Sequence, residues 1–156
     1  RKGFDVDAIC YDPYVSPEEA ARHGITKFEA LAEVVSRADL VNVSVPLTPS
    51  TVNLISGDVF SHFKPSAFLV NASRGSIVNE NDLYRALTQG GLAGAACDVF
   101  EVEPPTGQNP LLSLRNFVAT PHIGACSKES LLRVGMECVE QVLSIIDGGK
   151  PLHPIP

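Results

Sequence analysis

Short apolar runs alternate with segments of helical spacing along this chain. Five runs are expected to form strands: residues 6–11, 40–45, 67–72, 92–99 and 117–119. Helical patterns lie between and after these runs, at 16–23, from Leu31 onward, and at 56–63, 79–89 and 127–147. Strands that are apolar on both faces and alternate with helices predict an α/β fold, in which helices cover both sides of a parallel sheet.

The expected helices have recognisable starts. Ser16 can cap the first helix, with Pro17 at its first position. Thr26 and Glu29 form a capping-box pattern ahead of the helical spacing that begins at Leu31. In the longest helix, apolar or small residues recur at three- and four-residue steps and predict one buried stripe, which consists of Leu131, Gly135, Val139, Val142 and Ile146.

Charge and composition narrow the classes of function. The formal net charge of −6, without any basic run, argues against nucleic acid as a partner. No apolar stretch approaches the roughly 18 residues of a membrane-spanning helix, and the N-terminus lacks a signal-peptide pattern. The four cysteines do not have the spacing of a metal site, so no metal is expected. Free thiols predict a reducing, cytoplasmic location.

Three segments carry residues suited to chemistry on a small molecule with a carboxylate. The apolar run 68–70 ends in Asn-Ala-Ser-Arg-Gly, which would bring Arg74 to the carboxyl edge of the sheet, where ligands bind in open α/β folds. Arginine is well shaped to hold a carboxylate with two parallel hydrogen bonds. A glutamate in DVFEVEPP, either Glu101 or Glu103, supplies a second charged group. His122 in TPHIGA could exchange a proton near neutral pH.

The first expected strand leads to Asp12, where an acidic residue binds the adenosine ribose in dinucleotide-binding sheets. No GxGxxG turn precedes it, and the glycine-dense segment 90–94 has neither that spacing nor that position. We therefore expect the chain to begin inside its parent domain, without the first strand and the glycine-rich turn. The alternative is a complete domain in which Asp12 merely caps a turn.

Four motifs resemble those of the D-isomer-specific 2-hydroxyacid dehydrogenases, and they occur in that family's order. They are ADLVNVSVPLTPSTVNLI (38–55), KPSAFLVNASRGSIVNENDL (64–83), GLAGAACDVFEVEPP (91–105) and TPHIGACSKES (120–130). The resemblance implies a Rossmann-type, doubly wound parallel sheet with helices on both faces. It implies that residues 1–126 are a partial NAD-binding domain. Residues 127–156 would be a C-terminal helix and tail that lead back to a substrate domain outside this chain.

The same resemblance implies a role for each residue of the expected site. Arg74 would bind the substrate carboxylate, and His122 would be the general acid/base. Glu103 stands immediately before Pro104, as the family pattern requires, and would hydrogen-bond the second ring nitrogen of His122 and favour the imidazolium. Besides Arg74 and His122, the residues expected to bind the cofactor are Asp12, Val45, Pro46, Thr51, Ala72, Ser73, Asp98 and Gly124.

Asp12 also predicts which cofactor is bound. A carboxylate accepts hydrogen bonds from both ribose hydroxyls and repels the 2′-phosphate of NADP. The residues that follow, Pro13 and Tyr14, are not basic, whereas relatives that prefer NADP have basic residues there. The expected cofactor is therefore NAD.

Two functions fit these features. The leading hypothesis is an oxidoreductase that transfers a hydride between NAD and a small D-2-hydroxy acid or 2-keto acid. The alternative is an NAD-sensing corepressor of the same superfamily, which would keep the arginine, glutamate and histidine and bind peptide motifs. The intact parent is expected to be a homodimer without nucleic-acid or membrane partners. The isolated chain is expected to be inactive.

Overall fold

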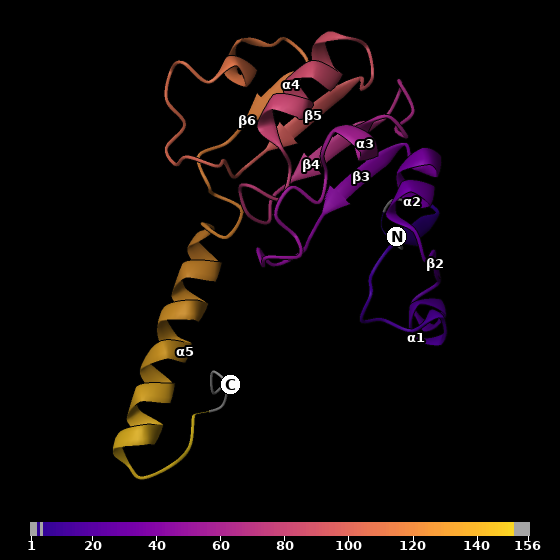
Figure 1. The fold of residues 1–156 in the computed structure, drawn as a ribbon. Helices are drawn as coiled ribbons and strands as arrows, with labels where there is room; N and C mark the ends of the chain where they lie inside the picture. Colours follow the sequence, from indigo (N-terminus) through magenta and orange to yellow (C-terminus); the bar gives the residue numbers. More distant parts are fainter. Residues whose placement is uncertain (1–2, 4, 152–156) are drawn as a thin grey trace. The chain divides into compact units, whose positions relative to one another are not determined.

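The computed structural model describes residues 3 and 5–151, which divide into two compact units (Figure 1). Unit 1 (Arg1–Pro121) contains all the strands of the described residues. In the described part of unit 2 (His122–Pro156), the one regular element is the helix α5 (Lys128–Ile146). The candidate residues Arg74 and Glu103 thus belong to unit 1, and His122 is the first residue of unit 2.

The strands of unit 1 form two sheets, and every strand pair is parallel. The first sheet pairs β1 (Ala8–Cys10) with β2 (Ile25–Lys27). The second has the order β3-β4-β5-β6, with β3 (Leu40–Val43), β4 (Phe68–Asn71), β5 (Gly94–Cys97) and β6 (Phe117–Ala119). Parallel neighbours need a crossover connection and end at the same edge. Parallel strands alternating with helices confirm the predicted α/β class.

The helices follow the predicted starts at most positions. They are α1 (Pro17–Arg22), α2 (Leu31–Arg37), α3 (Gly57–Phe60), α4 (Glu80–Thr88), the 3-10 helix η1 (Pro110–Ser113) and α5. The Ser16 hydroxyl accepts a hydrogen bond from the Glu19 amide, and the Asn79 side chain accepts one from the Asp82 amide. Both caps satisfy amides that lack a partner inside the helix.

The capping box expected at Thr26 is wrong. Residues Ile25–Lys27 form β2 instead, with Thr26 opposite Ile9 of β1. Helix α2 begins after Ala30 without a side-chain cap. The Glu29 carboxylate accepts a hydrogen bond from Lys27 Nζ at 2.9 Å. Pairing with β1 therefore overrides the local helix signal, as tertiary contacts often do.

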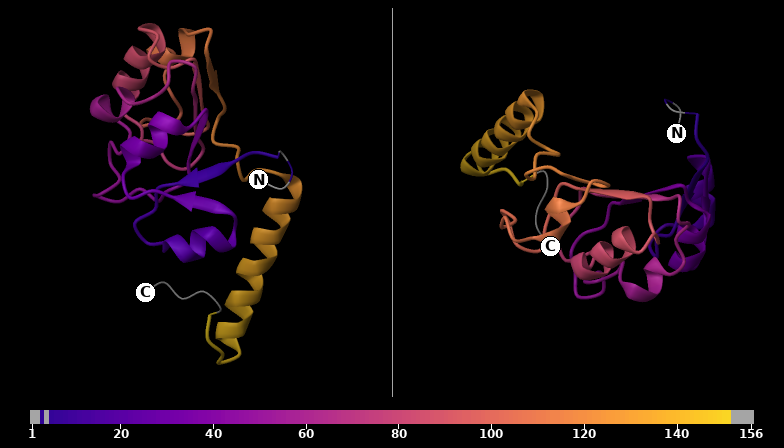
Figure 2. Two further views of the ribbon diagram at one scale, coloured as in Figure 1. Left: turned by 90° about the vertical axis from the view of Figure 1, so that its right-hand side faces the viewer. Right: turned by 90° about the horizontal axis from the view of Figure 1, so that it is seen from above.

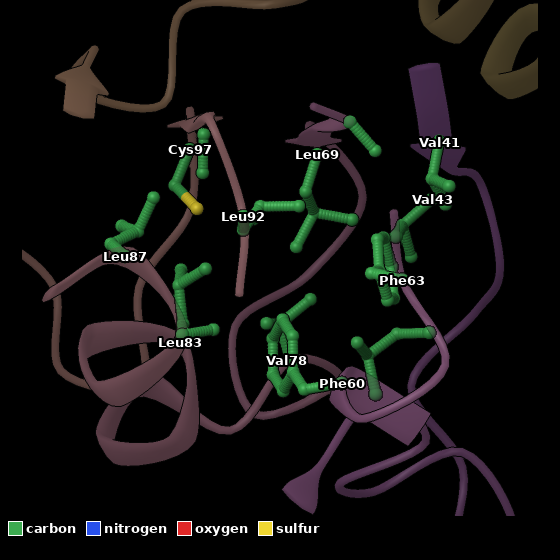
Figure 3. Close-up of a cluster of buried hydrophobic side chains, with 14 of the residues drawn as sticks. Val41, Val43, Phe60, Phe63, Leu69, Val78, Leu83, Leu87, Leu92 and Cys97 are labelled. Carbon is green, nitrogen blue, oxygen red and sulfur yellow. The ribbon is translucent and has the colours of Figure 1, made fainter. Parts of the chain in front are cut away.

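The hydrophobic core lies on one face of the four-stranded sheet (Figure 3). In register across that face stand Val41, Leu69 and Ala95. Helices α3 and α4 cover them from the same side (Figure 2). The side chains that these helices and the adjoining loops contribute include Phe60, Phe63, Val78, Leu83 and Leu87. This packing fixes the strand ends that carry the candidate site.

The opposite face of the same sheet leaves large apolar side chains exposed. Leu40, Phe68 and Val118 are more than half exposed, at 62%, 51% and 61%. The alternating burial along β3, exposed then buried, shows that the two faces of the sheet differ. The strands are thus apolar on both faces, as the sequence indicates, although unit 1 buries one face more fully.

The buried stripe predicted for α5 is wrong for the described chain. No residue of α5 is buried, and the stripe residues Leu131, Val139, Val142 and Ile146 are all exposed. Unit 2 has no second element among its described residues against which α5 could bury this face. None of the helices in residues 3 and 5–151 has both the length and the apolar character needed to cross a membrane.

Cys97, at the end of β5, predicts a pH dependence of stability. Burial, and secondarily the charge of Glu80, raises the pKa of Cys97 to about 12. The folded state therefore keeps this thiol proton at a pH where the unfolded chain loses it. Its contribution is complete below the unfolded pKa and declines as pH rises toward 12.

We expect the stability advantage of the wild type over Cys97→Ala to shrink by about 1–2 kcal/mol between pH 7 and pH 10, from the linkage of one proton. Chemical denaturation of the wild-type protein and of the variant at both pH values measures this difference. A difference that stays constant over this range would contradict the protected thiol.

Candidate functional site

Four candidate segments follow the carboxyl ends of parallel strands. Ala72 to Arg74 follow β4, and Asp98 follows β5, its neighbour in the sheet. Val45 and Pro46 follow β3 on the other side of β4, and Asp12 follows β1 of the two-stranded sheet. The turns after β3, β4 and β5 therefore share one edge, where open α/β sheets bind ligands.

A buried asparagine holds the turn that carries Arg74. Asn71 is 2% exposed, and its Nδ2 donates to the Arg74 carbonyl oxygen at 3.0 Å. Its Oδ1 accepts from the Ser73 amide at 3.2 Å and from the Ser73 hydroxyl at 2.9 Å. These bonds fix the backbone on both sides of the turn. The exposed Arg74 guanidinium donates through Nη1 to the Ser73 carbonyl oxygen at 2.7 Å.

The loop after β5 carries both candidate glutamates. The Glu103 Oε1 atom accepts a hydrogen bond from the Phe100 amide at 3.0 Å, so its carboxylate turns back toward the start of the loop. Phe100 is buried, whereas Glu101 and Glu103 are exposed. Gly75 lies directly beneath this loop, because a Cβ built on it would come within 1.9 Å of the Phe100 carbonyl oxygen. The Arg74 turn and the Glu103 loop are therefore in backbone contact.

Asp98 is buried and joins the ends of three neighbouring strands. Its backbone amide donates to the Asn71 carbonyl oxygen at 2.9 Å, and its Oδ1 atom accepts a hydrogen bond from the Thr120 hydroxyl. The Thr120 amide donates to the Cys97 carbonyl oxygen at 3.0 Å. Thr120 and Pro121 lead directly to His122, so Asp98 anchors the segment that precedes the histidine.

His122 has an uncommon backbone conformation. Its φ is 55°, in the left-handed region that residues other than glycine rarely occupy. Such outliers are frequent at functional sites. His122 and Gly124 are exposed, and the His122 carbonyl oxygen lies 3.7 Å from the Cys126 sulfur, which donates to it.

The residues expected near the adenosine and pyrophosphate are on short turns with internal hydrogen bonds. The Asp12 Oδ1 atom accepts from the Tyr14 amide at 2.8 Å. The Thr51 hydroxyl donates to the Pro46 carbonyl oxygen at 2.6 Å and accepts from the Thr48 amide at 2.8 Å. Val45 is half-buried. Thr51 thus shapes the loop after β3 through its own hydroxyl group.

Sequence reasoning missed two residues that hold the loops at this edge. One is Asn71, and the other is Glu80, whose carboxylate accepts hydrogen bonds from the Glu101 amide and from Asn109 Nδ2. The sequence did offer a signal for Asn71, because an asparagine that ends an apolar strand shortly before an arginine can hold the turn between them. Glu80 gave no signal beyond a favourable charge in the first turn of a helix. No group of three or more metal-ligating side chains occurs within residues 3 and 5–151.

A family model described as "D-isomer specific 2-hydroxyacid dehydrogenase, NAD binding domain" matches residues 1–124. The chain is 41% identical over 147 residues to D-3-phosphoglycerate dehydrogenase of Archaeoglobus fulgidus, and 40% identical over 147 residues to that of Methanocaldococcus jannaschii. Each comparison covers 94% of this chain and 28% of the relative. The chain therefore spans less than a third of the length of these relatives.

Solved structures share the fold. A D-isomer specific 2-hydroxyacid dehydrogenase from Lactobacillus delbrueckii ssp. bulgaricus, in its NAD complexed form, is similar with a TM-score of 0.86 and 28% identity, over 99% of this chain and 50% of that one. An NADPH-dependent glyoxylate/hydroxypyruvate reductase from Sinorhizobium meliloti, in complex with NADP and malonate, gives a TM-score of 0.89 and 30% identity, over 99% and 47%. Similar folds thus carry either nicotinamide cofactor, and particular residues must decide between them.

Proposed function

This chain belongs to the D-isomer-specific 2-hydroxyacid dehydrogenase family, through its NAD-binding domain, and we propose that the protein that carries it is an NAD-dependent oxidoreductase. Its substrates are a small D-2-hydroxy acid and the corresponding 2-keto acid. The observation that supports this most is the turn after β4, where buried Asn71 fixes the backbone of Arg74 beside the Glu103 loop.

In this proposal Arg74 binds the substrate carboxylate. Its guanidinium is exposed at the carboxyl edge of the sheet, while its backbone is held by Asn71. Two parallel charge-assisted hydrogen bonds would fix the plane of the carboxylate and the direction of the adjacent keto group. Holding the substrate in the reactive orientation lowers the entropic part of the activation free energy.

In this proposal His122 transfers the proton, and Glu103 is its hydrogen-bond partner. Reduction of a 2-keto acid requires a proton on the oxygen as the carbonyl carbon is reduced, and a histidine can supply it near neutral pH. A glutamate bonded to the other ring nitrogen would fix the tautomer. NAD, when bound, supplies or accepts the hydride.

The residues at the strand ends fit an NAD molecule chemically. The Asp12 carboxylate, after β1, is an acceptor suited to ribose hydroxyls. Ala72 has a small side chain, Gly124 has none, and both are exposed, so a flat ring could approach their backbone. Buried Asp98 already accepts a bond from Thr120, so its role in the proposal is to hold the Thr120 segment as well as to face the nicotinamide amide.

Loss of the Asp12 carboxylate should weaken the preference for NADH over NADPH. In Asp12→Ala, the ratio of kcat/KM with NADH to that with NADPH is expected to fall by roughly 10- to 100-fold, because repulsion of the 2′-phosphate is lost. Asp12→Asn keeps an oxygen for the Tyr14 amide but removes the charge, and should behave similarly. If the NADH/NADPH ratio fell in Asp12→Ala but not in Asp12→Asn, the effect would come from the shape of the turn and not from the charge.

The function itself is tested by steady-state oxidation of NADH by the natural protein with hydroxypyruvate, glyoxylate and pyruvate. Turnover of at least one of these acids is expected. Binding of NADH without turnover of any of them would contradict the oxidoreductase and favour a cofactor-sensing protein.

A further inference from the structure

Glu80 links the first turn of α4 to the loop that carries Glu103. Its Oε1 atom accepts a hydrogen bond from the Glu101 amide at 2.6 Å, and its Oε2 atom accepts one from Asn109 Nδ2 at 2.8 Å. These partners are 21 and 29 residues away in the sequence. One side chain therefore holds both ends of the loop, with Glu103 between them.

The far end of this link is attached to the core. Asn109 caps η1, because its Oδ1 atom accepts from the Leu111 amide at 3.1 Å. Leu111 is fully buried, with an exposure of 0%. The Asn109 amide also donates to the Thr106 carbonyl oxygen at 2.9 Å, which closes the end of the loop. Glu80 thus connects Glu101 to a rigid anchor.

The loop borders an open hollow beside Glu80. A hollow of about 230 Å³ lies against Glu80, and the loop residues Glu101, Val102, Pro105 and Thr106 are among those that line it. Val102 is 64% exposed. The two hydrogen bonds from Glu80 therefore restrain the loop where it borders this hollow, in addition to its backbone contact with Gly75.

Two successive amides near Glu103 are held by two different carboxylates. The Phe100 amide donates to Glu103, and the Glu101 amide donates to Glu80. Without Glu80, the Glu101 amide would lose this acceptor, and the backbone next to the amide that Glu103 binds would be held less firmly.

We propose that Glu80 is a positioning residue, whose carboxylate fixes the 101–109 loop and thereby holds Glu103 in place for proton transfer. This inference rests on the proposed function for its catalytic consequence. The restraint of the loop itself does not depend on that function.

The decisive comparison uses Glu80→Ala and Asp82→Ala in the natural protein. Asp82 is a matched control, because it lies in the same first turn and its carboxylate accepts a hydrogen bond from the distant Gly57 amide at 2.8 Å. Its ion pair is with Arg85 of the same helix rather than with the loop. We expect Glu80→Ala to lower kcat about 10- to 100-fold, as small misplacements of catalytic groups do. Asp82→Ala should lower it less than about threefold.

A double variant distinguishes positioning from a general loss of stability. If Glu80 acts through Glu103, the kcat of Glu80→Ala/Glu103→Ala should lie within about twofold of that of Glu103→Ala alone. Glu80→Gln keeps one acceptor oxygen and should retain intermediate activity. If the factors by which Glu80→Ala and Glu103→Ala lower kcat multiply in the double variant, Glu80 does not act through Glu103, and the proposal is overturned.

Amide hydrogen exchange tests the restraint without any assay of activity. In Glu80→Ala, or in Glu80→Gln should the alanine variant not fold, exchange in 101–109 should rise about tenfold while residues 83–88 of α4 remain protected. Unchanged exchange in the loop would overturn the proposal. Absence of turnover in the wild type would contradict the proposed function alone, and exchange would still decide the role of Glu80.

Discussion

Replacing Arg74 with glutamine in the natural protein is expected to lower kcat/KM for 2-keto acids by roughly 10²- to 10³-fold. Removing one partner of a charged, hydrogen-bonded pair costs about 2–5 kcal/mol, and each 1.36 kcal/mol is a factor of ten in rate. Asn71 bonds the backbone and not the side chain of Arg74, so the turn should keep its shape in the variant. Steady-state kinetics with NADH measure the effect.

Two further variants sharpen this result. Arg74→Lys keeps the charge but loses the planar pair of donors, so its activity should fall between those of the wild type and Arg74→Gln. Arg85→Gln removes a guanidinium that pairs with Asp82 on α4 at 3.0 Å, and should leave turnover nearly unchanged. Equal losses in Arg74→Gln and Arg85→Gln would show that Arg74 has no special part in binding substrate.

Replacing Gly75 with alanine is expected to destabilise the protein by about 3 kcal/mol or more, because a backbone clash in a packed region has no cheap relief. The new Cβ would lie 1.9 Å from the Phe100 carbonyl oxygen, 2.3 Å from its carbon and 2.8 Å from the Glu101 nitrogen. Either the Arg74 turn or the Glu103 loop must move. Activity should therefore fall even where the protein stays folded.

Gly107 provides the matched control. It lies in the same loop as Glu103, and a Cβ built on it meets nothing within 4 Å. Gly107→Ala should therefore change the melting temperature by only a degree or two. Gly75→Ala should lower it by roughly 6–12 °C or more, because each kcal/mol shifts the melting temperature by about 2–4 °C in a domain of about 150 residues. Similar melting temperatures for both variants would contradict the close approach of the two backbones.

The sequence was informative where local signals and packing agree. Ser16 caps a helix as predicted, the helix expected at 79–89 begins after Asn79, and Phe117–Ala119 forms the predicted strand. An apolar run that ends in small or polar residues marks the end of a buried strand. This pattern correctly predicted that Arg74 and Asp98 follow the ends of strands. For these elements the pattern of apolar and polar residues was sufficient to predict where helices begin and strands end.

Other features depend on contacts that local sequence does not encode. Thr26 has a strong helix signal, but pairing with β1 decides its structure. The two hydrogen bonds from Glu80 join residues more than twenty positions apart, and an acidic residue at the start of a helix has an adequate local explanation already. The apolar stripe of α5 predicts burial, but whether it is buried depends on which other elements lie within reach.

In the proposed function, Arg74 recognises the carboxylate of the substrate. The direct test compares kcat/KM for the 2-keto acid that the protein reduces best with that for its methyl ester, in the wild type and in Arg74→Gln. We expect the wild type to prefer the acid by roughly 10²-fold or more, and the variant to lose at least about tenfold of this preference, because the two changes remove the same interaction. An unchanged preference in the variant would contradict the claim.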